Sequence, residues 1–257
     1  MTALEHSYLT AFKREVALPP KLADLRESLI KARDPFAAFG KFLHSHEVLG
    51  FHYLRLWRPG ELKEAPPASA LFQRHSYCAD WSSQIAETAA FTYDPTVTLL
   101  RRGERAIVWQ SRITTTPEAA AYREQAHELG LVSGISLHLH EGRDGAAGLG
   151  LWCAPQPNAE SFATYWQGVG PMLAQAAWLL DHVLRDQRPN ALIGLTPREI
   201  DCLAGLMTGH RSGEICWQLN LSERTFEKHI SSAKTKLKAR TRDQALAKAM
   251  MLNLLPM

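Results

Sequence analysis

The sequence has few cysteines, no long hydrophobic run and little net charge, and each of these absences excludes a class of protein. The four cysteines of the 257-residue chain are far apart and form no CxxC pair: Cys78, Cys153, Cys202 and Cys216. This spacing favours free thiols in a reducing cytoplasm over a disulfide framework or a zinc knuckle. No apolar run approaches the roughly 20 residues of a membrane-spanning helix, and the N-terminus lacks the basic and apolar regions of a signal peptide. We therefore expect a cytoplasmic protein that does not enter the membrane.

Motifs of catalysis and metal binding are also missing. His44-x-His46 and His138-x-His140 could each place two imidazoles on one face of a strand, but no nearby Cys or carboxylate completes a metal-binding set. The serines and the scattered His and Asp residues form no nucleophile motif such as GxSxG. We therefore expect no enzymic activity, no metal and no cofactor. The alternative from another class is an enzyme or metal protein that uses its C-terminal segment only for docking.

The net charge of +3 is small, but it is unevenly distributed along the chain. Residues 195–257 contain 10 Lys or Arg and 6 Asp or Glu, a net charge of +4, so the rest of the chain carries −1. With 46% hydrophobic residues, the chain can bury a sizeable core in one large domain or two smaller ones. The basic excess predicts an acidic partner for the last quarter alone.

The first 184 residues show alternating helical and strand patterns. Helices are predicted at 3–16, 22–31, from 35 onward, 78–90, 95–103, 117–129 and 159–188, the last interrupted or kinked near Gly170-Pro171, and strands at 48–57, 71–75, 106–110, 134–140 and 148–153. The last two strands form a hairpin signature with a loop, 141–145, that is longer than two residues. Helices outside and strands between them predict an α+β domain whose sheet is covered on its faces. The polar stretch 185–194, which contains Pro and Gly, predicts an interdomain linker.

From residue 195 the pattern changes to four short helices. Thr196 to Glu199 and Thr241 to Gln244 are capping boxes, and Ser212 and Ser222 are predicted to cap the other two helices. The helix after Ser222 has an apolar stripe on one side and a basic, hydroxyl-bearing face on the other, and a tight turn precedes it. The stripe consists of Phe226, Ile230, Ala233 and Leu237. An ordinary solvated surface helix is the alternative for this helix alone, but four helices with such a turn predict an all-α helix-turn-helix domain at 195–257.

Three consecutive segments carry a family resemblance. Leu-Thr-Pro-Arg-Glu-Ile-Asp-Cys-Leu (195–203), Thr-Gly-His-Arg-Ser-Gly-Glu-Ile (208–215) and Leu-Ser-Glu-Arg-Thr-Phe-Glu-Lys-His (221–229), followed by Lys236-Leu237, resemble the LuxR-type helix-turn-helix without gaps. Glu199, Leu203 and Gly209 lie at the family's spacing. The resemblance implies that the helix after Ser222 enters a DNA major groove.

The residues expected to contact DNA fall into two groups. We expect Lys228 and Ser231 near base edges, where their substitution by alanine should erase sequence preference more than bulk affinity. Phosphate contacts are expected from the N-terminus of the Ser212 helix and from Arg224, Thr225 and Lys234. Where family members usually have Val and then often Lys, this chain has Phe226 and Glu227. Glu227 would be repelled by phosphate but can accept from a cytosine amine, so operator preference stays open.

The upstream residues resemble the autoinducer-binding domain of quorum-sensing LuxR regulators. The matching residues, in the family's order and spacing, are Tyr77, Trp81, Asp94-Pro95, Trp109 and Gly134, and the resemblance covers roughly residues 36–184. It implies an α-β-α sandwich with a central antiparallel sheet and a ligand between that sheet and the helices of one face. We therefore expect a ligand-binding domain at 1–184, a linker at 185–194 and a DNA-binding domain at 195–257.

An N-acyl-homoserine lactone has polar groups that need partners when buried. Trp81 can donate its Nε1–H to the lactone carbonyl, Asp94 can accept from the amide N–H, and Tyr77 can donate to the amide carbonyl with Ser136 as helper. Trp109 and strand residues such as Leu137, Leu149 and Leu151 are expected to wall the pocket. Taken singly, a buried Trp is more often core and an Asp-Pro pair is often a helix start.

One departure from the family lies beside the predicted lactone site. The family usually has a second tyrosine four residues after the tryptophan, where this chain has Ile85. The change re-shapes the pocket for another acyl chain or for a signal that is not a homoserine lactone. We expect a homodimeric, ligand-responsive transcription factor that reads a near-palindromic operator, with RNA polymerase as a further partner. The alternative is a receptor for a non-lactone small molecule, or one that binds DNA without ligand.

Overall fold

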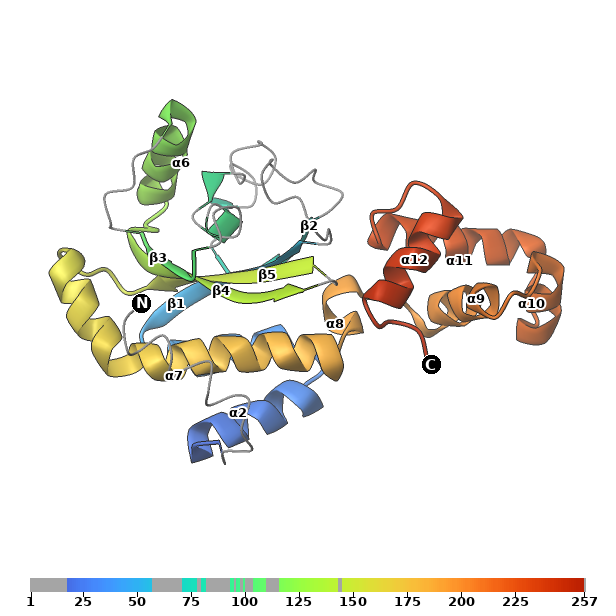
Figure 1. Ribbon diagram of the computed structural model, residues 1–257, viewed down its shortest axis with the longest axis horizontal. Coiled ribbons are helices and arrows are strands. Elements are labelled where there is room, and N and C mark those ends of the chain that lie inside the picture. The colour runs from blue at the N-terminus through green and yellow to red at the C-terminus, as the bar shows by residue number, and fades with distance from the viewer. Residues whose placement is uncertain are drawn as a thin grey trace.

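The computed structural model describes residues 18–56, 71–77, 80–81, 93–94, 96–97, 99, 104–109, 116–142 and 145–256. The predicted helix at 3–16, most of those at 78–90 and 95–103, and Ile85 lie outside these residues. Figure 1 shows an N-terminal part built around a sheet and a C-terminal part built of short helices.

Five antiparallel strands form the sheet, in the order β2-β1-β5-β4-β3. They are β1 (Val48–Leu56), β2 (Leu71–His75), β3 (Ala106–Val108), β4 (Ser133–Gly142) and β5 (Gly145–Cys153). All five were predicted. The predicted hairpin loop is wrong, because β4 and β5 remain paired as far as Gly142 and Gly145 and leave only residues 143 and 144 between them. Gly145 has a φ of +116°, which a residue with a side chain rarely adopts, and this glycine lets the pairing continue to the turn.

Helices lie on both faces of the sheet (Figure 1), which confirms the predicted α-β-α sandwich. One face is covered by α2 (Pro20–Lys31), α3 (Pro35–His44) and α7 (Ala159–Asp186), and α6 (Pro117–Glu128) lies on the other side. Caps explain where two of them start: Asp34 accepts from the N–H of Phe36, and Thr116 accepts from that of Ala119.

The long helix α7 was predicted to be interrupted or kinked near Pro171. It is one continuous helix with Pro171 inside it, and Figure 1 shows it bent rather than straight. A proline has no N–H to give to the carbonyl four residues earlier, which is a common cause of such bends. Within the apolar core between α7 and the sheet, one buried contact is polar. Buried Asp181 accepts from the hydroxyl of Tyr53 at 3.0 Å and from Nε of Arg185 at 2.9 Å.

The C-terminal part is all helical, as predicted. It consists of α9 (Pro197–Met207), α10 (Ser212–Leu219), α11 (Glu223–Lys236) and α12 (Arg242–Met251). The capping box of Thr196 and Glu199 is confirmed by hydrogen bonds in both directions.

At the starts of α10 and α12, the capping interactions differ from those predicted. Ser212 is not a cap, because Arg211 holds the extended N-cap conformation and its N–H donates to Glu214. Thr241 does cap α12, but the side chain of Gln244 accepts from the N–H of Arg240 rather than from that of Thr241. In both cases a long side chain three or four residues on satisfies a backbone donor just before the helix, which residue types alone do not decide.

Residues 185–194 are more structured than a polar linker. They contain the end of α7 and the short helix α8 (Asn190–Ile193). Arg188 donates to the carbonyls of Ile30 and Ala32, and the side chain of Asn190 pairs with both backbone groups of Leu195 at 2.7 Å. The division of the chain into two domains at this segment stays a prediction.

Candidate functional site

The two faces of the sheet have different chemistry. One row of paired residues runs across four strands: His75, His52, Gly150 and Ser136. The neighbouring rows on this face add further glycines, namely Gly50, Gly134 and Gly148. Because side chains alternate along a strand, the residues of the intervening rows, among them Leu137, Leu149 and Leu151, point to the other face. The expectation that Leu137, Leu149 and Leu151 wall the pocket is therefore wrong, since all three pack in the core beneath α3 and α7.

Several predicted ligand contacts gather on the glycine-bearing face. The ring of Tyr77 lies 5.3 Å from that of Trp81 and 6.4 Å from that of Trp109, both edge-on. Nε1 of Trp109 donates to the hydroxyl of Ser136 at 2.9 Å, and that hydroxyl lies 3.0 Å from the hydroxyl of Thr96. Ile85 lies outside the described residues.

The missing side chain of Gly150 makes room for these polar groups. A Cβ at this position would lie 2.8 Å from Oγ1 of Thr96 and 2.9 Å from the hydroxyl of Tyr77. At Gly134, a Cβ would lie 2.5 Å from the ring of Trp109. Both positions therefore exclude larger residues unless the neighbouring groups move. At Gly150, the hydroxyls of Thr96 and Tyr77 lie directly against the surface of the sheet.

Asp94 is only 2% exposed and makes several polar contacts. Its carboxylate accepts from the N–H of Thr96 at 2.6 Å and from the hydroxyl of Tyr122 at 2.7 Å, and Nδ1 of His52 lies 3.5 Å away. Burial alone raises the pKa of Asp94, but the contacts with His52, Tyr122 and Thr96 together lower the pKa below its ordinary value. Asp94 is therefore a buried carboxylate, which suits it to accept from a ligand N–H.

Three polar atoms in this cluster are buried without a hydrogen-bond partner. They are the hydroxyl of Tyr77, Nε1 of Trp81 and Nδ1 of His52. An unmade hydrogen bond of this kind costs about 1–3 kcal/mol. The atoms of Tyr77 and Trp81 are those predicted from the sequence to donate to a ligand. Both donors therefore remain available to oxygens of a bound ligand.

Sequence reasoning missed three residues of this cluster: His52, Thr96 and Tyr122. The alternation of β1 was a usable signal for His52, because it places this imidazole on the face opposite Phe51 and Tyr53. Thr96 carried a weaker signal, two residues after Asp94, which is the spacing at which an Asp side chain accepts from the backbone. Nothing in the sequence distinguishes Tyr122 from other helix residues.

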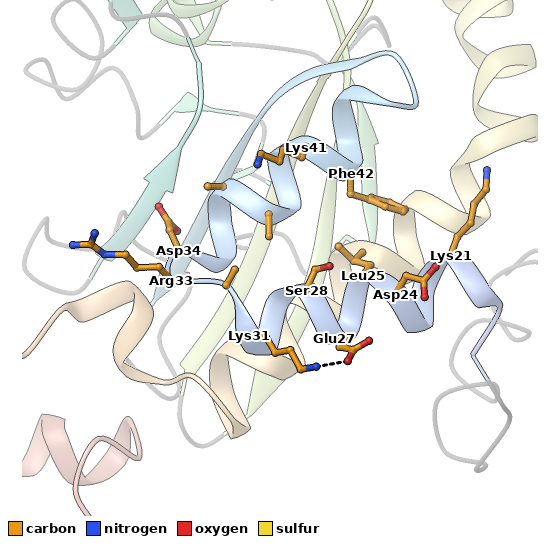
Figure 2. A pocket seen from close by; sticks show the side chains of 13 residues that line it. Lys21, Asp24, Leu25, Glu27, Ser28, Lys31, Arg33, Asp34, Lys41 and Phe42 are labelled. Carbon is orange, nitrogen blue, oxygen red and sulfur yellow. Dashed lines mark hydrogen bonds and ion pairs between the residues drawn. The ribbon is translucent and has the colours of Figure 1, made fainter.

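An open groove lies elsewhere, between α2 and α3. Figure 2 shows it lined mainly by charged side chains, among them Lys21, Asp24 and Lys41, with Glu27 and Lys31 paired across one turn of α2. It contains none of the predicted ligand contacts. This groove is open and bordered by charged side chains, whereas small-molecule sites are typically enclosed.

The second candidate surface is the exposed face of α11. Ser222 caps the helix, and Phe226, Ile230 and Ala233 are buried against the other C-terminal helices, as predicted. On the opposite side Arg224, Glu227, Lys228 and Ser231 are exposed, whereas Thr225 and Lys234 are partly buried. The hydroxyl of Thr225 already contacts that of Ser222 at 2.8 Å.

Two features fix α11 relative to its neighbours. Asn220 has a φ of +54°, which makes the tight turn between α10 and α11. On the inner side, buried Glu199 of α9 accepts from Lys236 and Ser232 of α11. Ser212 lies in the first turn of α10, and its hydroxyl is 3.5 Å from Nη1 of Arg242.

The described ranges hold neither a metal-binding group nor a membrane-spanning helix. No group of three or more His, Cys, Asp or Glu side chains there is placed to hold a metal ion. Across the same part of the chain, no helix has the length and apolar character needed to span a bilayer. Cys153, Cys202 and Cys216 are buried free thiols, as predicted for them.

Comparisons with known proteins match both parts of the chain. Residues 33–186 match the family model of the autoinducer binding domain, and residues 194–249 match that of bacterial regulatory proteins, luxR family. The chain is 30% identical over 181 residues to the transcriptional activator protein VanR of Vibrio anguillarum, covering 68% of this chain and 74% of VanR. It is 27% identical over 238 residues to SolR of Ralstonia solanacearum, covering 90% and 98%. Among solved structures, Escherichia coli SdiA aligns with a TM-score of 0.44 at 17% identity, over 98% of each chain.

Proposed function

The chain belongs to the LuxR family of bacterial regulatory proteins with an autoinducer-binding domain, and from this premise we propose that it is a signal-responsive regulator of transcription. In this proposal an N-acyl-homoserine lactone binds on the glycine-bearing face of the sheet. A dimer then presents two α11 helices about one DNA turn apart to a near-palindromic operator. Residues 1–184 sense the signal, and residues 195–257 bind DNA.

The observation that carries the ligand assignment is the set of unsatisfied donors around Asp94. Tyr77 and Trp81 each hold a buried donor without a partner, and their rings lie 5.3 Å apart. Tyr77 also interacts electrostatically with the carboxylate of Asp94, whose pKa is lowered. An acyl-homoserine lactone offers two carbonyl oxygens and one amide N–H, which complement two donors and one acceptor. Binding would therefore satisfy groups that are costly to leave unpaired.

The exposed face of α11 supports the DNA assignment. Arg224, Lys228 and Ser231 are exposed on one side of a capped helix whose other side is buried. In the proposal Lys228 and Ser231 face base edges, while Arg224, Thr225, Lys234 and the N-terminus of α10 at Ser212 hold phosphates. Glu227, exposed between them, is assigned to a base amine rather than to phosphate.

The decisive experiment measures whether lactones stabilise the purified chain. A ligand at 100 times its Kd adds about 2.7 kcal/mol, which for a protein of this size is roughly a 5–10 °C rise in Tm. We expect such a rise with at least one member of a panel from butanoyl- to dodecanoyl-homoserine lactone. Trp81→Phe should reduce it by removing the Nε1 donor, whereas Trp217→Phe, at a side chain that is 84% exposed, should not.

One outcome would favour the alternative function. If no lactone raises the Tm while the protein still binds a specific duplex, the chain senses a different small molecule or binds DNA unliganded. The replacement of the family's tyrosine by Ile85 is the feature of this sequence that favours that alternative.

A further inference from the structure

Tyr122 is a buried residue of α6 that lies in the candidate ligand site. It packs in one cluster with Tyr77, Trp81 and Leu131 and is 6% exposed. Its hydroxyl donates to Oδ2 of Asp94 at 2.7 Å. Burial and the neighbouring carboxylate raise the pKa of Tyr122 well above its ordinary value, so the hydroxyl keeps its proton and remains a donor. A side chain of the protein therefore already donates to the carboxylate that is proposed to accept from a ligand.

The two oxygens of the Asp94 carboxylate are held in different ways. Oδ1 accepts from the backbone N–H of Thr96 at 2.6 Å, two residues along the same segment, so this bond is local. Oδ2 accepts from a hydroxyl 28 residues away in the sequence, and Nδ1 of His52 lies farther off at 3.5 Å. A hydroxyl can redirect its hydrogen or move with its side chain, whereas the backbone donor moves with the aspartate itself. Oδ2 is therefore the oxygen at which a ligand N–H can replace a donor of the protein.

The helix that carries Tyr122 has few other buried contacts. Of its own residues, α6 buries only Tyr122 and Ala126. Figure 1 shows α6 on the face of the sheet opposite to α2 and α7. If Tyr122 gave no donor, the buried carboxylate of Asp94 would lose a bond to a charged group, which is costly inside a protein. The single hydroxyl therefore both pairs with Asp94 and ties α6 to the site.

We propose that the hydroxyl of Tyr122 is an internal substitute for the ligand N–H at Asp94, and that a signal molecule displaces it on binding. This inference rests on the proposed function. Without a signal, Tyr122 keeps Asp94 paired and α6 docked, so the chain folds without ligand. With a signal, the ligand N–H takes Oδ2 and Tyr122 releases it, so binding must break an internal bond. Tyr122 thus lowers the affinity for the signal and raises the concentration at which the protein responds.

The test measures competition between the hydroxyl and the ligand. Tyr122→Phe keeps the ring and removes only the hydroxyl. We expect it to raise the affinity for the N-acyl-homoserine lactone that most stabilises the wild type about tenfold in titration calorimetry, the equivalent of one hydrogen bond at about 1.4 kcal/mol. It should also lower the Tm of the ligand-free protein by about 3–6 °C. This difference in Tm should close at saturating lactone, because the tighter binding offsets the lost bond.

Tyr53→Phe is the matched control, because Tyr53 also donates from a buried hydroxyl to a buried aspartate. Its bond to Asp181 is 3.0 Å long and lies in the core between the sheet and α7, on the other face. This variant should lower the ligand-free Tm in the same way and leave the lactone affinity within about twofold.

The matched ligand is the O-acyl lactone with the same chain, in which an ester oxygen replaces the amide N–H. It has no hydrogen to offer Asp94, so Tyr122 keeps its bond when this ligand binds. Tyr122→Phe should therefore leave the affinity for the O-acyl lactone within about twofold. An equal gain for both ligands would mean that the hydroxyl acts through packing, and it would overturn the inference.

The remaining outcomes separate this inference from the proposed function. A loss of lactone affinity in Tyr122→Phe would make Tyr122 a direct ligand contact, and an unchanged affinity would make it purely structural. Either result overturns the inference and leaves the proposed function intact. If Tyr122→Phe can be purified only with lactone present, the ligand has replaced the missing donor, which supports the inference, whereas a variant that lactone does not rescue contradicts it. If no lactone binds the wild type, the proposed function fails and this inference fails with it.

Discussion

Glu199 is a charged side chain that is 3% exposed, and its partners decide what it contributes. Lys236 donates to both of its oxygens, at 2.8 and 3.0 Å, and Ser232 and the N–H of Thr196 also donate. Burial raises the pKa of Glu199, but these bonds outweigh it and lower the pKa below the ordinary value. A lowered carboxyl pKa contributes stability above the unfolded-state pKa of about 4.3 and loses it as pH falls through the folded-state value.

We therefore expect Glu199→Gln to lower the free energy of unfolding by about 2 kcal/mol near neutral pH, the loss of hydrogen bonds to a charged group. The deficit relative to the wild type should shrink as the pH falls below about 4. Urea unfolding over this pH range measures both effects. Glu227→Gln, at an exposed position of α11, should stay within about 0.5 kcal/mol of the wild type. A deficit that is constant with pH would contradict the role given to the charge.

At the scale of single residues, the sequence predicted the site residues that are of a rare type and also lie at the spacing of the resembled family. Tyr77, Trp81 and Asp94 were predicted from the sequence, and the fold brings the rings of Tyr77 and Trp81 to 5.3 Å. His52 and Tyr122 were not predicted, because their roles come from contacts with a carboxylate that lies 42 and 28 residues away in the sequence. Such contacts depend on strand register and helix docking, which a single sequence does not encode locally.

At the scale of elements, the exposed face of α11 leads to a prediction about DNA binding. Lys228 and Ser231 are three residues apart, so they lie on the same exposed face of the helix. Replacing both with alanine should lower the ratio of specific to non-specific affinity, at about 1–3 kcal/mol for each base contact. Arg224→Ala should instead weaken binding to all duplexes and reduce the salt slope by about one.

The measurement is fluorescence anisotropy on a duplex selected by the wild type from a random library, with a scrambled duplex as reference. Titrations over a range of salt concentrations separate the two effects, because phosphate contacts carry the salt dependence. If the doubly substituted protein keeps the sequence preference of the wild type, α11 does not read bases through Lys228 and Ser231.

Element boundaries were predictable where a cap or a proline marks them. Pro35 and Thr116 place the starts of α3 and α6 as predicted, because the fixed φ of proline and a capping oxygen act within one turn. The hairpin was not predictable, since the residues from Glu141 to Gly145 suit both a long loop and continued pairing. The choice is made by the neighbouring strand β1, which pairs with β5 as far as Ala146 and so extends the ladder.

At the scale of the whole molecule, the edge strand β2 joins the two parts of the chain. His75 at its end pairs with His52 in the candidate ligand site. Three residues earlier, Phe72 is buried in the hydrophobic cluster of the C-terminal helices, with Leu195 and Leu237. Figure 1 shows β2 at the side of the sheet that faces these helices. The sequence predicts a separating linker and gives no sign of this contact, because an apolar residue in a strand pattern is expected to pack on its own sheet.

The ring of Phe72 lies close to the ammonium groups of two lysines. Nζ of Lys238 lies 5.8 Å and Nζ of Lys248 lies 6.0 Å from the ring centroid, within the range of a cation–π interaction. Lys248 is itself buried and donates to the carbonyls of Leu237 and Lys238, at the end of α11. Removing the ring would therefore leave a cavity in the packed cluster and also expose the ammonium of Lys248, which caps the end of α11.

We expect Phe72→Ala to cost about 3–4 kcal/mol, the usual loss for a buried phenylalanine, and to uncouple the two parts. Differential scanning calorimetry should show one transition for the wild type and two for the variant, because parts that lose their shared contact unfold independently. Phe72→Leu keeps an apolar side chain in place and should retain a single transition with a smaller loss. A single transition at an unchanged Tm in Phe72→Ala would mean that β2 and the C-terminal helices contribute nothing to each other's stability.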